Sequence, residues 1–94
     1  LPTPGHTPGH CSFIISSNEE KAYVLGDAAH IPLQLSETDW SPAADTDGNI
    51  ARATRHKLFD RIESENALIA SGHFPFPGLG HAKREGGQRT FKPI

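Results

Sequence analysis

Short apolar runs separated by polar turns dominate the first quarter of the chain. Residues 12–16 (SFIIS) and 22–25 (AYVL) are rich in β-branched and aromatic side chains, and the polar segment 18–21 separates them. This pattern predicts two strands joined by a hairpin turn. A third run, residues 67–71 (ALIAS), predicts a buried strand, and residues 85–88 (EGGQ) predict the turn of a last hairpin.

One long helix is expected between about residues 49 and 65, with Asp47 as its N-cap and Asn66 as its terminator. Its apolar positions follow the helical period and form one stripe: Ala51, Thr54, Leu58, Phe59 and Ile62. The charged side chains that we expect on the opposite, solvated face are Arg52, Arg55, Lys57, Asp60, Arg61 and Glu63. The order β-β-α-β-β predicts an α+β fold in which a helix crosses one layer of sheet.

Loops take up much of the remaining chain, which contains eight Pro and nine Gly. Residues 3–10 (TPGHTPGH) form a loop in which Pro fixes φ and Gly permits tight backbone paths. Residues 28–46 show neither a strand nor a helix period, so they are expected to be irregular. Trp40 is the large aromatic side chain that we expect to anchor them.

Composition limits the classes of protein that the chain can belong to. Its 94 residues make at most one domain, with a thin margin of stability. The net charge of −2, with acids and bases interspersed, gives no reason to expect nucleic acid or an anionic membrane as a partner. No apolar run approaches the ~20 residues that span a bilayer. The single Cys11 excludes an internal disulfide and favours a reducing compartment, so the cytoplasm is the first expectation.

Three positions at predicted strand ends carry side chains that ligate metals. His6 lies in the Pro- and Gly-rich loop, Asp27 follows Gly26 after the second strand, and His73 closes the segment 71–73 (SGH). Imidazole and carboxylate groups held on such loops are the ligands of a Zn²⁺-type hydrolytic centre. The three residues are far apart in the sequence, so only tertiary structure can bring them together.

These motifs resemble, in the right order, the later metal-ligand motifs of metallo-β-lactamase-fold hydrolases. The resemblance implies a four-layer αβ/βα sandwich, of which residues 1–94 would form the C-terminal part. The family's His-x-His-x-Asp-His motif, which belongs to the N-terminal half, is absent, and the chain begins without Met. We therefore expect a fragment of a larger polypeptide, with three of an expected seven ligands.

The resemblance also implies roles for the three residues. His6 would complete a three-histidine site, Asp27 would bridge two metals, and His73 would bind the second metal. Two zinc ions are expected per complete site, although Fe or Mn would also suit these ligands. Metal-bound hydroxide would then attack a small-molecule lactone, ester or phosphotriester. Residues 73–81 (HFPFPGLGH) look like the lactonase and methyl-parathion-hydrolase-like branch.

Other side chains allow both a functional and a structural interpretation. The candidates for a substrate pocket are His30, Phe74, Phe76 and His81, although aromatic residues under a Pro-rich loop are more often packing residues. His10 is expected to make hydrogen bonds within its loop rather than to bind metal.

Two other functions stay open. The chain could be a non-catalytic structural half that self-associates or pairs with the missing half, because its apolar strands lack an evident covering layer. A metal-binding module with a redox role is the other alternative, and bound iron would indicate it.

Overall fold

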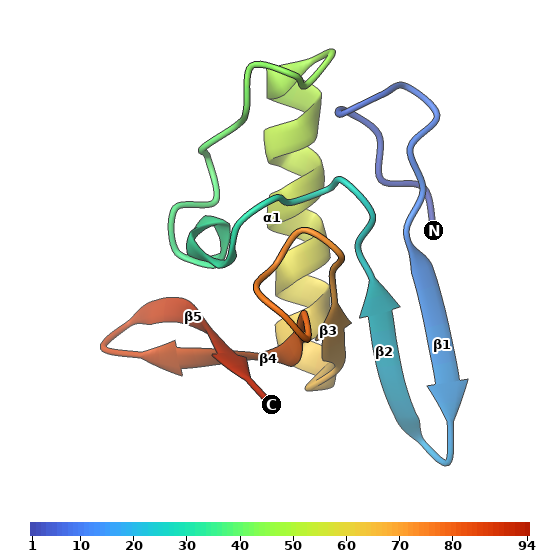
Figure 1. Ribbon diagram of the computed structural model, residues 1–94, viewed down its shortest axis with the longest axis vertical. Helices are drawn as coiled ribbons and strands as arrows, with labels where there is room; N and C mark the ends of the chain where they lie inside the picture. Colours follow the sequence, from blue (N-terminus) through green and yellow to red (C-terminus); the bar gives the residue numbers. More distant parts are fainter.

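A five-stranded mixed sheet with one long helix across it forms the fold of the computed structural model, which describes residues 1–94 (Figure 1). The strands are β1 (Phe13–Ser17), β2 (Glu20–Val24), β3 (Leu68–Ala70), β4 (Leu79–Glu85) and β5 (Gln88–Pro93); the helix is α1 (Gly48–Glu65), and a single 3₁₀ turn, η1 (Pro32–Leu35), precedes it. The α+β class and the helix across one sheet are confirmed. The expected order was one strand short, because the last hairpin contributes both β4 and β5.

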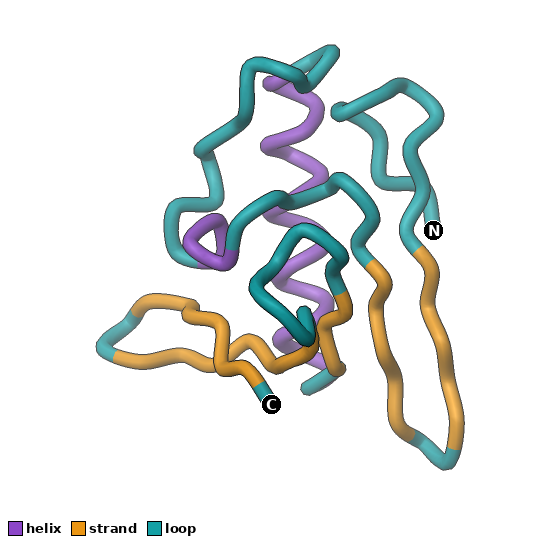
Figure 2. Tube along the Cα trace, viewed as in Figure 1, coloured by secondary structure: helices purple, strands orange, loops and turns teal.

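The sheet order brings three loops to one end of the sheet. The strands lie in the order β1-β2-β3-β4-β5, and only β2 and β3 are parallel. The carboxyl ends of β2 and β3 therefore lie at the same end of the sheet. The start of β1 lies at this end too, because β1 runs antiparallel to β2. Figure 2 shows the loops before β1, after β2 and after β3 gathered at this end.

Helix α1 begins and ends where the sequence predicts. The carboxylate of Asp47 accepts a hydrogen bond from the backbone N–H of Ile50 at 3.1 Å, which satisfies one free donor of the first turn. Asn66 adopts a left-handed conformation, with φ of 50°, and ends the helix. The buried side chains of α1 pack against the face of the sheet that carries Tyr23 and Ile69, both fully buried.

The expectation that Arg55 lies on a solvated face is wrong. Arg55 is 0% exposed and lies in the same buried stripe as Ala51, Leu58 and Ile62. Its position follows the helical period, four residues after Ala51, so the periodicity indicated the correct face. A charged side chain stays in solvent unless buried groups can pair with it, and the guanidinium of Arg55 has several such partners.

The long loop between β2 and α1 is anchored by Gln34, and the expected role of Trp40 is also wrong. Trp40 is 53% exposed. The buried side-chain carbonyl of Gln34 accepts hydrogen bonds from the backbone N–H groups of His30 and Ile31, at 2.6 and 3.2 Å. Its amide donates to the carbonyl of Trp40 at 2.7 Å. One polar side chain therefore closes the loop that follows Asp27.

The sheet face opposite α1 is apolar and has no covering layer in this chain. Phe13 and Ile15, which point to the same side of β1, are 71% and 57% exposed, whereas Ile14 between them packs against the core. Their register partners on β2 are Val24 and Ala22. Neither α1 nor η1 combines the length and the hydropathy that a helix needs to span a bilayer.

Candidate metal centre

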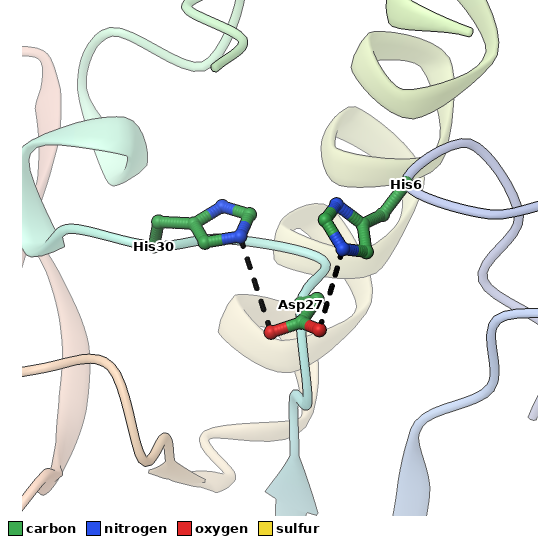
Figure 3. Close-up of side chains that lie close together, drawn as sticks. All are labelled: His6, Asp27 and His30. Carbon is green, nitrogen blue, oxygen red and sulfur yellow. Dashed lines mark ion pairs between the residues drawn. The ribbon is translucent and has the colours of Figure 1, made fainter. Parts of the chain in front are cut away.

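Four side chains from three loops converge at the loop end of the sheet. His6 comes from the N-terminal loop, Asp27 and His30 from the segment after β2, and His73 from the loop after β3. Figure 3 shows the carboxylate of Asp27 between the imidazoles of His6 and His30, which point toward it from opposite sides. The parallel pairing of β2 and β3 places Asp27 and His73 side by side, although 46 positions separate them in sequence.

The donor atoms lie at distances that suit a metal ion. Nε2 of His6 lies 3.4 Å from Oδ2 of Asp27, and Nε2 of His30 lies 3.9 Å from Oδ1 of the same carboxylate. Nε2 of His73 bonds to Oδ1 of Asp27. One donor atom each from His6, Asp27 and His30 lies within 4.8 Å of the others. His30, which the sequence placed only among pocket candidates, is thus among the ligand-type side chains.

The protonation states of this cluster also suit a metal ion. The hydrogen bond from His73 lowers the pKa of Asp27, and His6 and His30 lower it further, so the carboxylate is ionised at neutral pH. Burial lowers the pKa of His30, and the neighbouring His73 adds to this effect. His30 is therefore neutral at pH 7, as an imidazole ligand must be.

The chemistry of this donor set fits a zinc ion. Imidazole nitrogens and a carboxylate are common zinc ligands, and here they converge on one point. Nδ1 of His30 and Oδ2 of Asp45 are the two buried side-chain polar atoms without a hydrogen-bond partner. Oδ2 of Asp45 faces the guanidinium of Arg55 at 3.5 Å, and His30 directs its other ring nitrogen, Nε2, toward the cluster.

His10 lies beside the cluster and holds its backbone. Its Nε2 accepts a hydrogen bond from the backbone N–H of Asp27 at 2.9 Å, so the ring proton is on Nδ1, which faces the carbonyl of Thr3 at 3.1 Å. The expectation that His10 makes hydrogen bonds within the loop region is confirmed. The hydroxyl of Thr3, which is buried, lies 2.8 Å from the same Nδ1.

The structure does not bring the other pocket candidates into this cluster. Phe74 is buried in the core, where its ring lies 5.0 Å from that of Phe91 in an edge-to-face contact. Phe76 is 99% exposed in the loop after His73. His81 lies on β4, opposite Leu68 of β3.

Asp45 and Arg55 are residues near the site that the sequence analysis missed. Nδ1 of His6 lies 2.9 Å from Oδ1 of Asp45, and Oδ2 of Asp45 lies 3.5 Å from Nη1 of Arg55. No local motif marks Asp45, because it lies in an irregular loop 39 residues from its histidine. For Arg55, the sequence contained one signal of burial, namely its position in the apolar stripe of the helix.

Comparison with known proteins identifies the family. The family model of the metallo-beta-lactamase superfamily matches residues 1–73. This chain therefore belongs to the metallo-beta-lactamase superfamily. No curated protein sequence gives a significant match.

Solved structures of lactonases and hydrolases share the fold. AidC, described as a dizinc quorum-quenching lactonase and solved with a product, N-hexanoyl-L-homoserine, is 34% identical over 100% of this chain, with a TM-score of 0.90. AbOPH, a hydrolase in the beta lactamase superfamily, is 33% identical over 100% of the chain, with a TM-score of 0.92. A mutant of AiiA from B. thuringiensis, with N-decanoyl-L-homoserine at its active site, is 28% identical over 79% of the chain, with a TM-score of 0.66.

The chain is much shorter than these relatives. It covers 32% of the AidC chain, 33% of the AbOPH chain and 29% of the AiiA chain. The chain thus spans about a third of the length of the proteins that it resembles.

Proposed function

We propose that these 94 residues are the C-terminal part of a zinc-dependent hydrolase domain, in which His6, Asp27 and His73 bind metal. The observation that carries the proposal is the convergence of three loops on the Asp27 carboxylate. The 34% identity to a dizinc lactonase over the whole chain supports zinc as the metal. The rest of the ligand set would come from a part of the domain that this chain does not contain.

Each residue has a role that follows from its surroundings. Asp27 stays ionised and offers two oxygens on opposite sides, one toward His6 and one toward His30 and His73, which suits a carboxylate shared between two ions. His6 and His73 each direct Nε2 toward this carboxylate. Zinc bound at such a site activates water and neutralises the negative charge that develops on the substrate.

The proposed substrate is a lactone or a related ester, and a phosphotriester is the next candidate. The product N-hexanoyl-L-homoserine in the AidC structure and the N-decanoyl-L-homoserine at the active site of the AiiA mutant support this choice. His30 is neutral at pH 7 and partly exposed, with Nε2 directed into the cluster, so it can hydrogen bond to a substrate oxygen as well as approach a metal. The ring of Phe76, which is exposed in the loop that carries His73, could contact an acyl chain.

A second candidate function is a structural half without catalytic activity of its own. The uncovered apolar face around Phe13 and Ile15 favours this alternative, because such a face promotes association with another chain or with itself. In both candidate functions, a further layer must cover the apolar face around Phe13 and Ile15. They differ in whether the assembled protein binds zinc and turns over substrate.

The test uses the full-length protein that contains these residues. Replacement of His6, Asp27 or His73 by alanine is expected to remove bound zinc and to lower lactone hydrolysis by at least 10²-fold, because a ligand of the reacting centre is lost. Metal content by mass spectrometry and hydrolysis of an N-acyl homoserine lactone are the measurements. His56→Ala is the matched control, because His56 is an exposed histidine that pairs with Asp39. Full zinc content and full activity in the three variants would refute the proposal.

A further inference from the structure

A buried ion pair lies directly behind His6. Oδ1 of Asp45 lies 2.9 Å from Nδ1 of His6, and Oδ2 lies 3.5 Å from Nη1 of Arg55. The side chain of Asp45 is 1% exposed and that of Arg55 is 0% exposed. Burying two charges costs hydration free energy that their attraction only partly returns. Stability alone therefore gives a weak reason for placing this pair behind a histidine.

The contact with Asp45 selects one tautomer of His6. A carboxylate beside a guanidinium can only accept hydrogen bonds, so Nδ1 of His6 carries the proton and donates it to Asp45. In the neutral form of the ring, Nε2 is then the nitrogen with the free lone pair, and it faces Oδ2 of Asp27 at 3.4 Å. This is the nitrogen, and the protonation state, that a metal ligand at this place needs.

Arg55 holds the carboxylate in place from helix α1. Its Nε donates to the carbonyl of Thr38 at 3.0 Å, and its Nη2 donates to the hydroxyl of Ser41. Nη1, which faces Asp45, also lies 3.4 Å from the carbonyl of Ala28, the residue after Asp27. The guanidinium is thus fixed at three points of the loop that leads to Asp45, and it has little freedom to move.

We propose that Asp45 and Arg55 form a positioning pair for His6. Asp45 fixes the tautomer and the ring orientation, and Arg55 holds Asp45 and balances its charge. The inference rests on the proposed function, because it takes His6 as a zinc ligand. Neither residue of the pair contacts the Asp27 carboxylate: Asp45 acts through His6, and Arg55 acts through Asp45 and through its contact with the Ala28 carbonyl. Loss of such a hydrogen-bond partner behind a ligating histidine typically costs 10–100-fold in metal affinity.

Zinc affinity of the full-length, metal-free protein gives the first test. Zinc is titrated against a chromogenic chelator, and Asp45→Asn is expected to weaken binding about 10–100-fold. Asp39→Asn is the matched control, because it removes a carboxylate that lies 2.7 Å from a histidine nitrogen, His56 Nε2, on the surface. The control should bind zinc as the wild type does. Wild-type affinity in Asp45→Asn would overturn the positioning role.

The tautomer of His6 gives a second test that a purely structural role would not affect. In ¹⁵N spectra of the metal-free wild type, we expect the His6 proton on Nδ1, in a single form. A neutral His6 ring with its proton on Nε2 and none on Nδ1 would overturn the inference, and this measurement decides even if Asp45→Asn fails to fold. In a folded Asp45→Asn protein we expect a mixture of tautomers, because the amide binds either form.

A third variant separates this inference from the proposed function. His6→Ala should abolish zinc binding at the site. Zinc binding that depends on His6 but not on Asp45 would overturn the positioning pair and leave the proposed function in place. Zinc binding that is independent of His6 would overturn both.

Discussion

At the scale of single residues, hydrogen bonds to the histidine nitrogens organise the site. His10 accepts the backbone N–H of Asp27, and its ring packs against Gly26, where a Cβ atom would lie 2.9 Å from Nε2. Gly26 also has a φ of +62°, which glycine adopts without strain. The close contact between the backbone and the His10 ring therefore fixes the backbone position from which the Asp27 side chain extends. His10 thus acts on the site through the backbone of Asp27 and not through its carboxylate.

Replacement of His10 by alanine is expected to affect both stability and zinc binding. The N–H of Asp27 loses its acceptor, so the free energy of unfolding should fall by about 1–3 kcal/mol. Zinc affinity should fall by about tenfold, because the carboxylate is less well placed. Urea unfolding and zinc titration of the full-length protein measure the two effects, with His56→Ala as the control. Unchanged zinc affinity would show that His10 has only a structural role.

At the scale of elements, the ends of α1 are fixed to the loops and to the last hairpin. The N-terminal loop contacts the start of the helix through Gly5, whose carbonyl accepts the N–H of Asp47 at 2.9 Å. The C-terminal half of α1 is tied to β4 and β5 through Glu63, which accepts hydrogen bonds from Arg84 and Arg89. The helix therefore connects the loop that carries His6 with the sheet.

Gly5→Ala tests how closely this loop packs on α1. A Cβ atom at Gly5 would lie 2.3 Å from the Cα of Ala51, and the φ of +136° is strained for any other residue. We expect a loss of roughly 2 kcal/mol or more in the free energy of unfolding, because the contact is with backbone and cannot relax by a rotamer change. Gly9→Ala is the control, since its Cβ would meet nothing within 4 Å. Equal stability of the two variants would contradict this packing.

Glu63 is expected to make stability depend on pH. Hydrogen bonds from Arg84, and then from Arg89, lower the pKa of Glu63 from 4.5 to about 2. A lowered pKa means that the ionised form stabilises the fold: the contribution is complete above about pH 4.5 and is lost as the pH falls toward about 2. Glu63→Gln should lower the free energy of unfolding at pH 7 by roughly 1–2 kcal/mol. This difference should shrink as urea unfolding is repeated from pH 5 down to about pH 3, and a constant difference would contradict the assignment.

At the scale of the whole molecule, the uncovered sheet face is the feature with the largest consequence. α1 covers one face of the sheet, while Phe13 and Ile15 are exposed on the other. The relatives are about three times as long as this chain, so they have enough additional chain to supply a second layer. We therefore expect this face to be buried in the complete domain.

The 94-residue chain made alone is expected to self-associate through this face. Sedimentation at micromolar concentration should show dimers or larger species, because the exposed apolar side chains are better buried against a second copy than left in water. A double variant, Phe13→Lys with Ile15→Lys, should shift the chain toward monomer. Trp40→Ala is the control, because Trp40 is an exposed aromatic residue in the loop between η1 and α1 and not on a strand. A monomeric wild type would contradict the expectation.

The sequence determined the elements, because their signals are local. Alternating and periodic apolar positions gave the strands and the helix, and Asp47 and Asn66 marked its ends by their capping chemistry. His6, Asp27 and His73 could also be predicted, since each lies in a short motif beside a strand. What they bind remains a proposal.

Only the tertiary structure decided which other side chains join them. His30 enters the cluster because Gln34 closes its loop, and Asp45 reaches His6 because α1 and the long loop meet there. Arg55 is buried because three carbonyl or hydroxyl oxygens and a carboxylate surround it. These outcomes depend on contacts between residues distant in sequence, and neither propensity nor periodicity contains that information.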